Sequence, residues 1–230
     1  FLLFLMTAIV VIVFGLMVFV MIRFRAGRNP VPSKTSHNTL VEVLWTVLPI
    51  LILVVIAVPS FRLLYFQRVI PEADLTIKAV GYQWYWGYEY PDHGDFAFDS
   101  LMLSDAERGS QPRLLATDTA MVVPVGKTVR VVVTGADVLH AFAMPAFGLK
   151  IDAVPGRLNE TWFKAEKTGT YYGQCSELCG IRHAFMPIRI EVVEPEVFAN
   201  WVSDAQEEYA ALEGSKTKLA ADNVNISSIR

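Results

Sequence analysis

Two long apolar segments dominate the first part of the chain. Residues 1–22 contain no charged side chain, and residues 40–61 contain only Glu42. As a helix rising ~1.5 Å per residue, each segment would reach roughly 33 Å, enough to cross a hydrocarbon core of about 30 Å. The pattern therefore predicts a transmembrane helical hairpin in residues 1–70, with residues 23–39 as its connection. A signal peptide is the alternative for the first segment, but the apolar stretch is too long and no small-residue cleavage site follows it.

The pattern changes to that of strands in residues 71–194. Stretches such as LTIKAV, TVRVVVTG, TWFKA and PIRIEVV alternate apolar and polar positions, and Gly, Pro, Asp and Asn cluster between them. Many short strands with regular punctuation predict a β-sandwich or Greek-key barrel.

Residues 195–230 form the last predicted segment, a helix followed by a polar tail. The sequence after Gly214 is polar and aperiodic, which is typical of a tail. The predicted helix is a surface helix that closes the domain, because its apolar residues recur at helical spacing. These residues are Phe198, Trp201, Val202, Tyr209 and Leu212.

Composition and charge place these segments relative to a membrane. The chain is 53% apolar, which exceeds the value of ordinary soluble domains. The connection between the two apolar segments is basic and holds no acidic residue, so it stays on the cytoplasmic side and everything after about residue 62 faces outward. We expect a bacterial inner membrane with the β domain in the periplasm, or alternatively a mitochondrial inner membrane with that domain in the intermembrane space. The basic residues of the connection between the two apolar segments are Arg23, Arg25, Arg28 and Lys34.

Net charge differs between the two parts of the chain. Residues 1–70 hold six Lys or Arg and one acidic residue, which leaves 14 basic and 22 acidic residues in the remainder. An acidic surplus favours a basic protein partner. We expect no nucleic-acid partner.

The segment CSELCGIRHAFMPI, residues 175–188, holds both cysteines of the chain together with a histidine and a methionine. Thiolate, thioether and imidazole are donors that favour copper, and two thiolates are enough to bridge two copper ions. A disulfide between Cys175 and Cys179 is one alternative, because the outer compartment permits it, but it leaves His183 and Met186 unexplained. The other alternative is that all four are ordinary core or structural residues.

A dinuclear site needs a second imidazole from elsewhere in the chain. His37 lies in the cytoplasmic connection and is excluded by topology. His93, between acidic residues in YPDHGDF, is typical of a solvated turn. His140 lies at a strand end beside a turn-rich segment, and we therefore predict it as the second imidazole.

Three motifs and the helical hairpin resemble subunit II of the haem-copper cytochrome c oxidases, over residues 1 to about 201. The motifs are CSELCGIRHAFMPI, ADVLHAFAMPAFGLKIDAVPGRLN and GYQWYWGYEY. The resemblance implies a two-helix transmembrane hairpin, an all-β cupredoxin-like Greek-key barrel or sandwich, and a C-terminal surface helix. It also implies a copper-bearing subunit that takes electrons from reduced cytochrome c at a dinuclear copper centre, CuA. The electrons would pass to the haem of subunit I, for oxygen reduction to water coupled to proton pumping.

The resemblance assigns a ligand set to the copper centre. The Glu177 carboxylate would also reach a magnesium ion at the boundary with subunit I. The partners implied are cytochrome c, subunit I and other oxidase subunits, and membrane lipid. The implied copper ligands are the thiolates of Cys175 and Cys179, the imidazoles of His140 and His183, the sulfur of Met186 and the backbone carbonyl of Glu177.

Two further residues are assigned roles in electron and proton entry. Trp84 would be the point of electron entry, although a strand that packs aromatic residues on both faces would also explain GYQWYWGYEY. Glu42 would stand at the entrance of a proton path, although Thr39 and Glu42 also fit a capping box that starts the second helix.

Three acidic residues match positions where the family docks the lysine-rich face of cytochrome c, namely Glu89, Asp118 and Asp137. Each by itself is equally explained as a solvated surface charge.

Three other kinds of protein share parts of this pattern. Subunit II of a quinol oxidase has the same fold but lacks the copper ligands. A nitrous oxide reductase carries a similar copper loop on a soluble enzyme without the hairpin. A membrane-anchored copper-delivery or assembly protein would bind copper singly and exchange it, so the number of copper ions per chain separates these functions.

Overall fold

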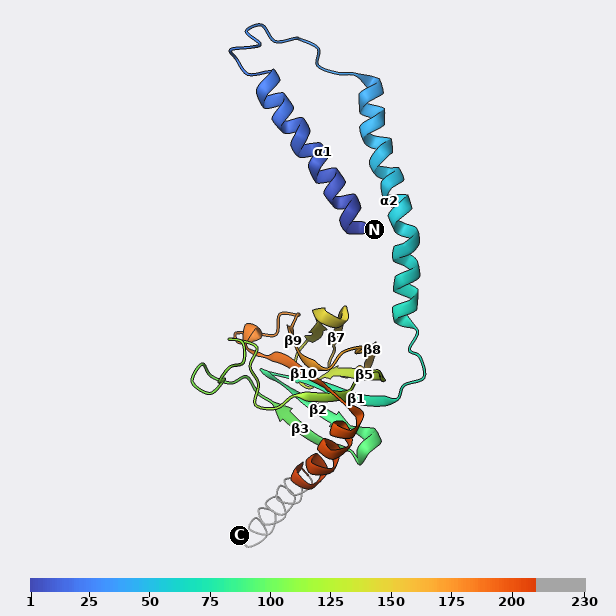
Figure 1. The fold of residues 1–230 in the computed structure, drawn as a ribbon, viewed down its shortest axis with the longest axis vertical. Coiled ribbons are helices and arrows are strands. Elements are labelled where there is room, and N and C mark those ends of the chain that lie inside the picture. The colour runs from blue at the N-terminus through green and yellow to red at the C-terminus, as the bar shows by residue number, and fades with distance from the viewer. Residues whose placement is uncertain (210–230) are drawn as a thin grey trace, which may run out of the picture. The chain divides into compact units, whose positions relative to one another are not determined.

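The chain divides into two compact units, residues 1–66 and the residues from Gln67 onward (Figure 1). The structure, a computed structural model, describes residues 1–209. Leu212 and the predicted tail after Gly214 lie outside the described residues.

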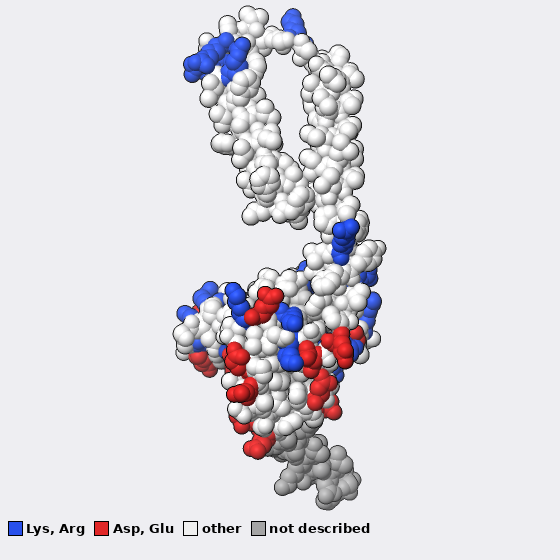
Figure 2. All heavy atoms as spheres, turned by 45° about the vertical axis from the view of Figure 1, so that its right-hand side comes forward, with Lys and Arg blue, Asp and Glu red and all other residues white. Residues whose placement is uncertain are grey.

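The first unit consists of two helices, α1 (Leu2–Arg23) and α2 (Thr39–Arg68). Both are long and apolar enough to cross a membrane. Among the described residues neither helix buries a side chain, so the apolar side chains of both helices are left uncovered there. Lys and Arg side chains gather at the connection between the two helices (Figure 2). The helix α2 continues to Arg68, past Phe61, where the predicted span ends.

The cap of α2 differs by one residue from the predicted one. Oδ1 of Asn38 accepts hydrogen bonds from the backbone N–H groups of Leu40 (3.1 Å) and Val41 (3.2 Å). The backbone N–H of Asn38 donates to Oε1 of Glu42 at 3.2 Å. The prediction of Thr39 as the capping residue was therefore wrong, because Asn caps a helix at least as well as Thr and stands one position earlier. The reciprocal bond, in which Glu42 accepts from the backbone N–H of Asn38, forms nevertheless.

The second unit is a sandwich of two five-stranded sheets, which confirms the predicted β architecture. The first sheet has the order β3-β2-β1-β5-β8, with β1 (Leu75–Tyr82), β2 (Tyr85–Tyr90), β3 (Phe96–Ser100), β5 (Thr128–Gly135) and β8 (Asn159–Lys164). The second has the order β4-β10-β9-β6-β7, with β4 (Met121–Pro124), β6 (His140–Met144), β7 (Leu149–Ala153), β9 (Gly169–Cys175) and β10 (Pro187–Val193). The pairs β1–β5 and β4–β10 are parallel and the other named pairs are antiparallel.

The core between the sheets is rich in aromatic side chains from β2. Trp86, Tyr88 and Tyr90 are fully buried. The hydroxyl of Tyr90 donates to the carbonyl of Val122 and accepts from its N–H, both at 2.9 Å, and so joins the two sheets. The predicted surface helix is confirmed over residues 195–209, where the ring of Trp201 lies 5.1 Å from that of Tyr90.

The motif GYQWYWGYEY forms a hairpin and not one continuous strand. Strand β1 ends at Tyr82 and β2 begins at Tyr85, with Gln83 and Trp84 as the turn. The rings of Tyr82 and Tyr85 stack with centroids 4.7 Å apart. The sequence interpretation as a single strand was wrong because the turn contains no Gly, Pro, Asn or Asp, the residues that usually mark one. Trp84 therefore lies at the tip of the hairpin.

Candidate metal centre

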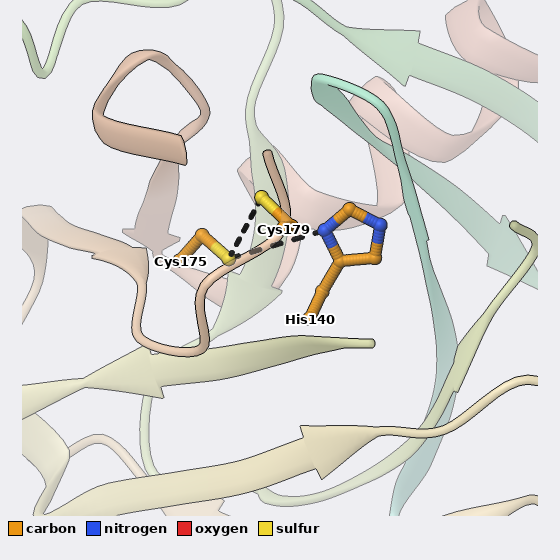
Figure 3. Close-up of side chains that lie close together, drawn as sticks. All are labelled: His140, Cys175 and Cys179. Atoms are coloured by element: carbon orange, nitrogen blue, oxygen red, sulfur yellow. Dashed lines mark hydrogen bonds between the residues drawn. The ribbon is translucent and has the colours of Figure 1, made fainter. Parts of the chain in front are cut away.

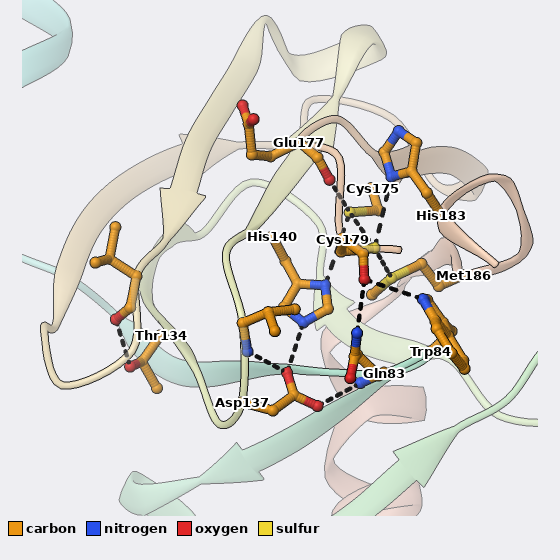
Figure 4. Close-up of polar contacts among 12 residues, drawn as sticks. Gln83, Trp84, Thr134, Asp137, His140, Cys175, Glu177, Cys179, His183 and Met186 are labelled. Atoms are coloured by element: carbon orange, nitrogen blue, oxygen red, sulfur yellow. Dashed lines mark hydrogen bonds and ion pairs between the residues drawn. The ribbon is translucent and has the colours of Figure 1, made fainter. Parts of the chain in front are cut away.

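Three segments that are far apart in the sequence meet at the candidate site. They are the tip of the β1–β2 hairpin, the start of β6, and the loop between β9 and β10 (Figure 4). Strands β6 and β9 are antiparallel neighbours, with Phe142 opposite Cys175. Continuing this register by two residues places His140, the first residue of β6, beside the middle of the cysteine loop.

The two thiols lie close together and are free. Their Sγ atoms are 3.9 Å apart, and Sγ of Cys175 lies 4.0 Å from Nδ1 of His140 (Figure 3). The candidate ligand atoms of His140, Cys175 and Cys179 all lie within 4.8 Å of one another, and all three residues are buried. Such a cluster of unpaired donors, closed off from solvent, is typical of a metal site.

The remaining predicted ligands complete two separate groups around these thiols. Sγ of Cys175 lies 3.4 Å from the carbonyl oxygen of Glu177. Sγ of Cys179 lies 3.6 Å from Nδ1 of His183 and 3.5 Å from Sδ of Met186. Each cysteine therefore has its own imidazole and its own weak donor: His140 and Glu177 for Cys175, His183 and Met186 for Cys179.

This donor set fits copper. Thiolate and thioether sulfur together with imidazole nitrogen are the ligands that copper sites use, whereas magnesium and calcium take oxygen. The side chain of Met186 is completely buried, as is that of His140, so water has little access to the donors. The cluster supports a copper site.

The pKa values of the two thiols shift in opposite directions. Burial raises the pKa of Cys175, but hydrogen bonds from the His140 ring and the backbone outweigh it and lower the pKa to about 6. Burial and the neighbouring Cys175 charge raise the pKa of Cys179 to about 12. Burial also lowers the pKa of His140, but its bonds to Cys175 and Asp137 raise it above the ordinary value. A bound cation would displace the remaining protons, because metals bind the thiolate.

Three residues outside the ligand set hold the site in place. Oδ1 of Asp137 lies 2.9 Å from Nε2 of His140. Nε2 of Gln83 and Nε1 of Trp84 donate to the carbonyl oxygen of Cys179, at 2.8 and 3.2 Å. A supporting role was predicted for neither Asp137 nor Gln83. The only signal was an acidic residue three positions before the histidine.

The other predicted site residues lie elsewhere or face other partners. The carboxylate of Glu177 points away from the sulfur atoms that its carbonyl faces (Figure 4). Glu89 forms an ion pair with Lys78 at 2.7 Å. Oδ1 of Asp118 accepts from the backbone N–H groups of Leu101 and Thr119. Glu42 belongs to the helical unit.

His93, the rejected candidate for the second imidazole, faces the C-terminal helix. Its ring lies 5.6 Å from that of Phe198. Its ring therefore contacts a helix side chain, whereas that of His140 faces the thiols.

Comparison with known proteins gives consistent results for both units. The family model described as "Cytochrome C oxidase subunit II, periplasmic domain" matches residues 75–193, and "Cytochrome C oxidase subunit II, transmembrane domain" matches residues 1–63. A "Probable cytochrome c oxidase subunit 2" of Rickettsia bellii is 60% identical over 96% of this chain and 82% of its own length. The "Cytochrome c oxidase subunit 2" of Cereibacter sphaeroides is 49% identical over 90% of this chain and 74% of its own. The crystal structure of the periplasmic domain of subunit II of cytochrome oxidase from Bradyrhizobium japonicum is 67% identical, covers 61% of this chain and 99% of its own, and has a TM-score of 0.59.

Proposed function

The chain belongs to the cytochrome c oxidase subunit II family, and we propose that it carries the dinuclear copper centre through which electrons from reduced cytochrome c reach the haem of subunit I. It is thus a membrane-anchored subunit of an oxidoreductase complex, and oxygen reduction itself belongs to subunit I. One observation carries the proposal: two free, buried thiols 3.9 Å apart, each with its own imidazole.

The six candidate ligands would hold the two ions in different ways. Cys175 and Cys179 would bridge them, and the other four residues would complete each half of the site. A copper pair bridged by two thiolates supplies one-electron exchange. The protein supplies a dry and rigid enclosure, because Trp86 packs beside the His140 ring, Phe142 packs on Trp86, and both residues are fully buried.

Trp84 has the properties of an entry point for electrons. Its indole is half-buried at the tip of the β1–β2 hairpin, so part of the ring faces the surface. Its Nε1–H donates to the carbonyl of Cys179 at 3.2 Å, which gives a short bonded route from that surface to the cysteine. We propose that the donor protein docks over this ring.

The docking partner is a cytochrome c with lysines around its haem edge. The outer unit, from Gln67 onward, holds 15 basic and 22 acidic residues, seven more acidic than basic. Asp118 and Asp137 carry charges that no lysine or arginine neutralises among the described ion pairs, whereas Glu89 is paired with Lys78. We propose these three acids as the docking patch, with Asp118 contributing more than Glu89.

Glu177 is suited to a second metal at the boundary with subunit I. Its carbonyl faces the thiols and its carboxylate faces the other way, so one residue can serve two sites (Figure 4). Carboxylate oxygen is a ligand that Mg²⁺ prefers. When cells are grown with Mn²⁺ in place of Mg²⁺, the assembled oxidase with Glu177→Gln should lose the electron paramagnetic resonance signal of bound manganese. A signal that persists unchanged would remove Glu177 from that site.

The two helices and the bacterial relatives support anchoring in a bacterial inner membrane, with the β unit in the periplasm. The basic connection between α1 and α2 agrees with this orientation, since such loops stay in the cytoplasm (Figure 2). Lipid would contact the unburied faces of both helices.

The decisive experiment is the copper content and electron paramagnetic resonance spectrum of the purified full chain. We expect two copper ions per chain and a hyperfine pattern of one unpaired electron shared equally by both nuclei. A His183→Ala variant should lose that pattern, and a His93→Ala variant should keep it, because His93 contacts Phe198 and not the thiols. One copper per chain, with the spectrum of a single ion, would instead favour a membrane-anchored copper-delivery protein.

A further inference from the structure

We propose that Asp137 is a positioning residue that fixes two separate parts of the copper centre at once: the ring of His140 and the hairpin tip that carries Trp84. The inference rests on the proposed function, because it concerns the same site. Asp137 lies in the turn between β5 and β6 (Figure 4). Its Oδ1 is 2.9 Å from Nε2 of His140 and 2.6 Å from the backbone nitrogen of Val138, and its Oδ2 accepts from the backbone N–H of Gln83 at 2.7 Å.

The contact with His140 determines which ring nitrogen faces the thiols. A carboxylate only accepts, so its partner Nε2 carries the proton, and Nδ1 is left to face Sγ of Cys175 at 4.0 Å. Gly81 lies against the same ring. A Cβ at that position would lie 2.8 Å from Cδ2 of His140 and would clash with the ring. The glycine therefore leaves room for the imidazole. The imidazole is therefore held at its edge by Asp137 and at its flank by β1.

The contact with Gln83 fixes the hairpin tip from one side, and the cysteine loop fixes it from the other. The side chains of Gln83 and Trp84 both donate to the carbonyl of Cys179. Gly180 has a φ of +118°, and a Cβ there would lie 3.1 Å from Cζ2 of Trp84. The indole thus packs directly on the loop backbone. Asp137 completes this arrangement, because it joins the tip to the strand that carries His140.

A positioning role differs measurably from a docking role. The carboxylate of Asp137 uses both oxygens in bonds within the protein, and its side chain is 36% exposed. A docking charge acts only when the donor protein is present and weakens with salt. A positioning group acts on the copper site itself, without a donor.

The test uses the copper-loaded full chain in detergent, without cytochrome c. The carboxylate of Asp137 faces three N–H donors, and the amide of Asp137→Asn turns its own NH₂ group toward at least one of them. We expect this change to weaken copper binding by about ten- to a hundredfold, measured in competition with a chelator. The nitrogen couplings of the imidazoles should change as well. Asp74→Asn is the matched control, since Asp74 also accepts from a backbone N–H, that of Thr128, and pairs with Lys127. Unchanged copper affinity and couplings in Asp137→Asn would overturn the proposal.

The metal-free full chain provides a second readout that does not depend on copper. Deuterium should exchange faster at the Gln83 amide in Asp137→Asn than in the parent chain, because that N–H loses its acceptor. If the variant does not fold, ¹⁵N resonances of the parent chain decide, and a His140 ring without a proton on Nε2 would overturn the proposal. Fewer than two copper ions in the parent chain, with the Gln83 and His140 results as expected, would count against the proposed function alone.

Discussion

A single indole joins the surface of the outer unit to the interior of the metal centre. Trp84 packs on Gly180 and donates to the carbonyl of Cys179, whose thiol is one of the two bridging candidates. Electron transfer through protein is favoured where bonded contacts replace gaps, so the hydrogen bond to Cys179 and the ring contact with Gly180 can each contribute to the path. A substitution that removes only the hydrogen bond separates the two contributions.

A Trp84→Phe variant keeps an aromatic ring at the hairpin tip but removes the bond to Cys179. We expect electron entry from reduced cytochrome c to slow at least about tenfold, which corresponds to ~1.4 kcal/mol in the barrier, while copper content stays the same. Stopped-flow oxidation of cytochrome c by the assembled oxidase measures the rate. Trp201→Phe is the control, because that indole belongs to the C-terminal helix and packs on Tyr90. Equal rates in both variants would remove Trp84 from the electron path.

The sequence located the candidate ligands better than the residues that support them. Cys175, Cys179, His183 and Met186 stand within one short loop, so their types and spacing were visible directly, whereas Glu177 was named only through the family resemblance. The bond between Gln83 and Asp137 joins residues 54 positions apart and depends on a turn that carries no turn residue. The room that Gly81 leaves for His140 depends on the packing of the two sheets. Neither relation has a local signal.

At the scale of elements, the start of α2 shows how one acid can serve two purposes. Glu42 accepts from the backbone N–H of Asn38, and Asn38 caps the first turn in return. This reciprocal arrangement fixes where the helix begins. We propose that the same carboxyl group stands at the start of a proton path into subunit I.

Replacing Glu42 by Gln separates these two purposes. The amide oxygen of Glu42→Gln can still accept from Asn38, so we expect the helix to begin at the same residue and the oxidase to assemble. The amide cannot release a proton, so proton uptake from the cytoplasmic side should slow by roughly tenfold, less than the loss of a general acid at a reacting atom, because water can bypass a boundary group. Indicator-dye measurements on oxidase vesicles follow the uptake. Uptake at the parent rate would leave Glu42 with the capping role alone.

The elements of the outer unit were predictable to different degrees. Strands β5 and β10 coincide with TVRVVVTG and PIRIEVV, because each alternates buried and half-buried residues. Strand β6 is buried at every position, so it shows no alternation from which a strand could be recognised. The hairpin tip was missed for a related reason: aromatic residues on both sides of Gln83 and Trp84 hide the turn.

At the scale of the whole chain, charge is divided between the two units. The helical unit has a basic excess that fixes its orientation in the membrane, and the outer unit has an acidic excess. The acidic excess acts over distance, since charges about 10 Å apart still attract at 0.1 M salt. It should therefore control how often a basic donor protein arrives, and have less effect on what happens after it has docked.

Two substitutions that remove the same charge should have unequal effects on this arrival rate. Asp118→Asn removes an exposed carboxylate that accepts from backbone N–H groups and takes part in none of the described ion pairs. Glu89→Gln removes one that Lys78 already neutralises at 2.7 Å and leaves that lysine unpaired. We expect Asp118→Asn to lower the association rate with a lysine-rich cytochrome c about two- to threefold at low salt, with a smaller salt dependence, and the difference from the parent chain to vanish near 0.5 M salt.

The association rate of Glu89→Gln bears on the same question from the opposite direction. Glu89→Gln changes the net charge by the same amount as Asp118→Asn and leaves Lys78 free to repel the donor. If net charge alone determines the arrival rate, the rate falls in both variants with the same salt dependence. If the ion pair already screens that position, the rate changes less in Glu89→Gln than in Asp118→Asn. Association rates that fall equally in both variants and do not respond to salt would show that the acidic excess of the outer unit does not steer the donor.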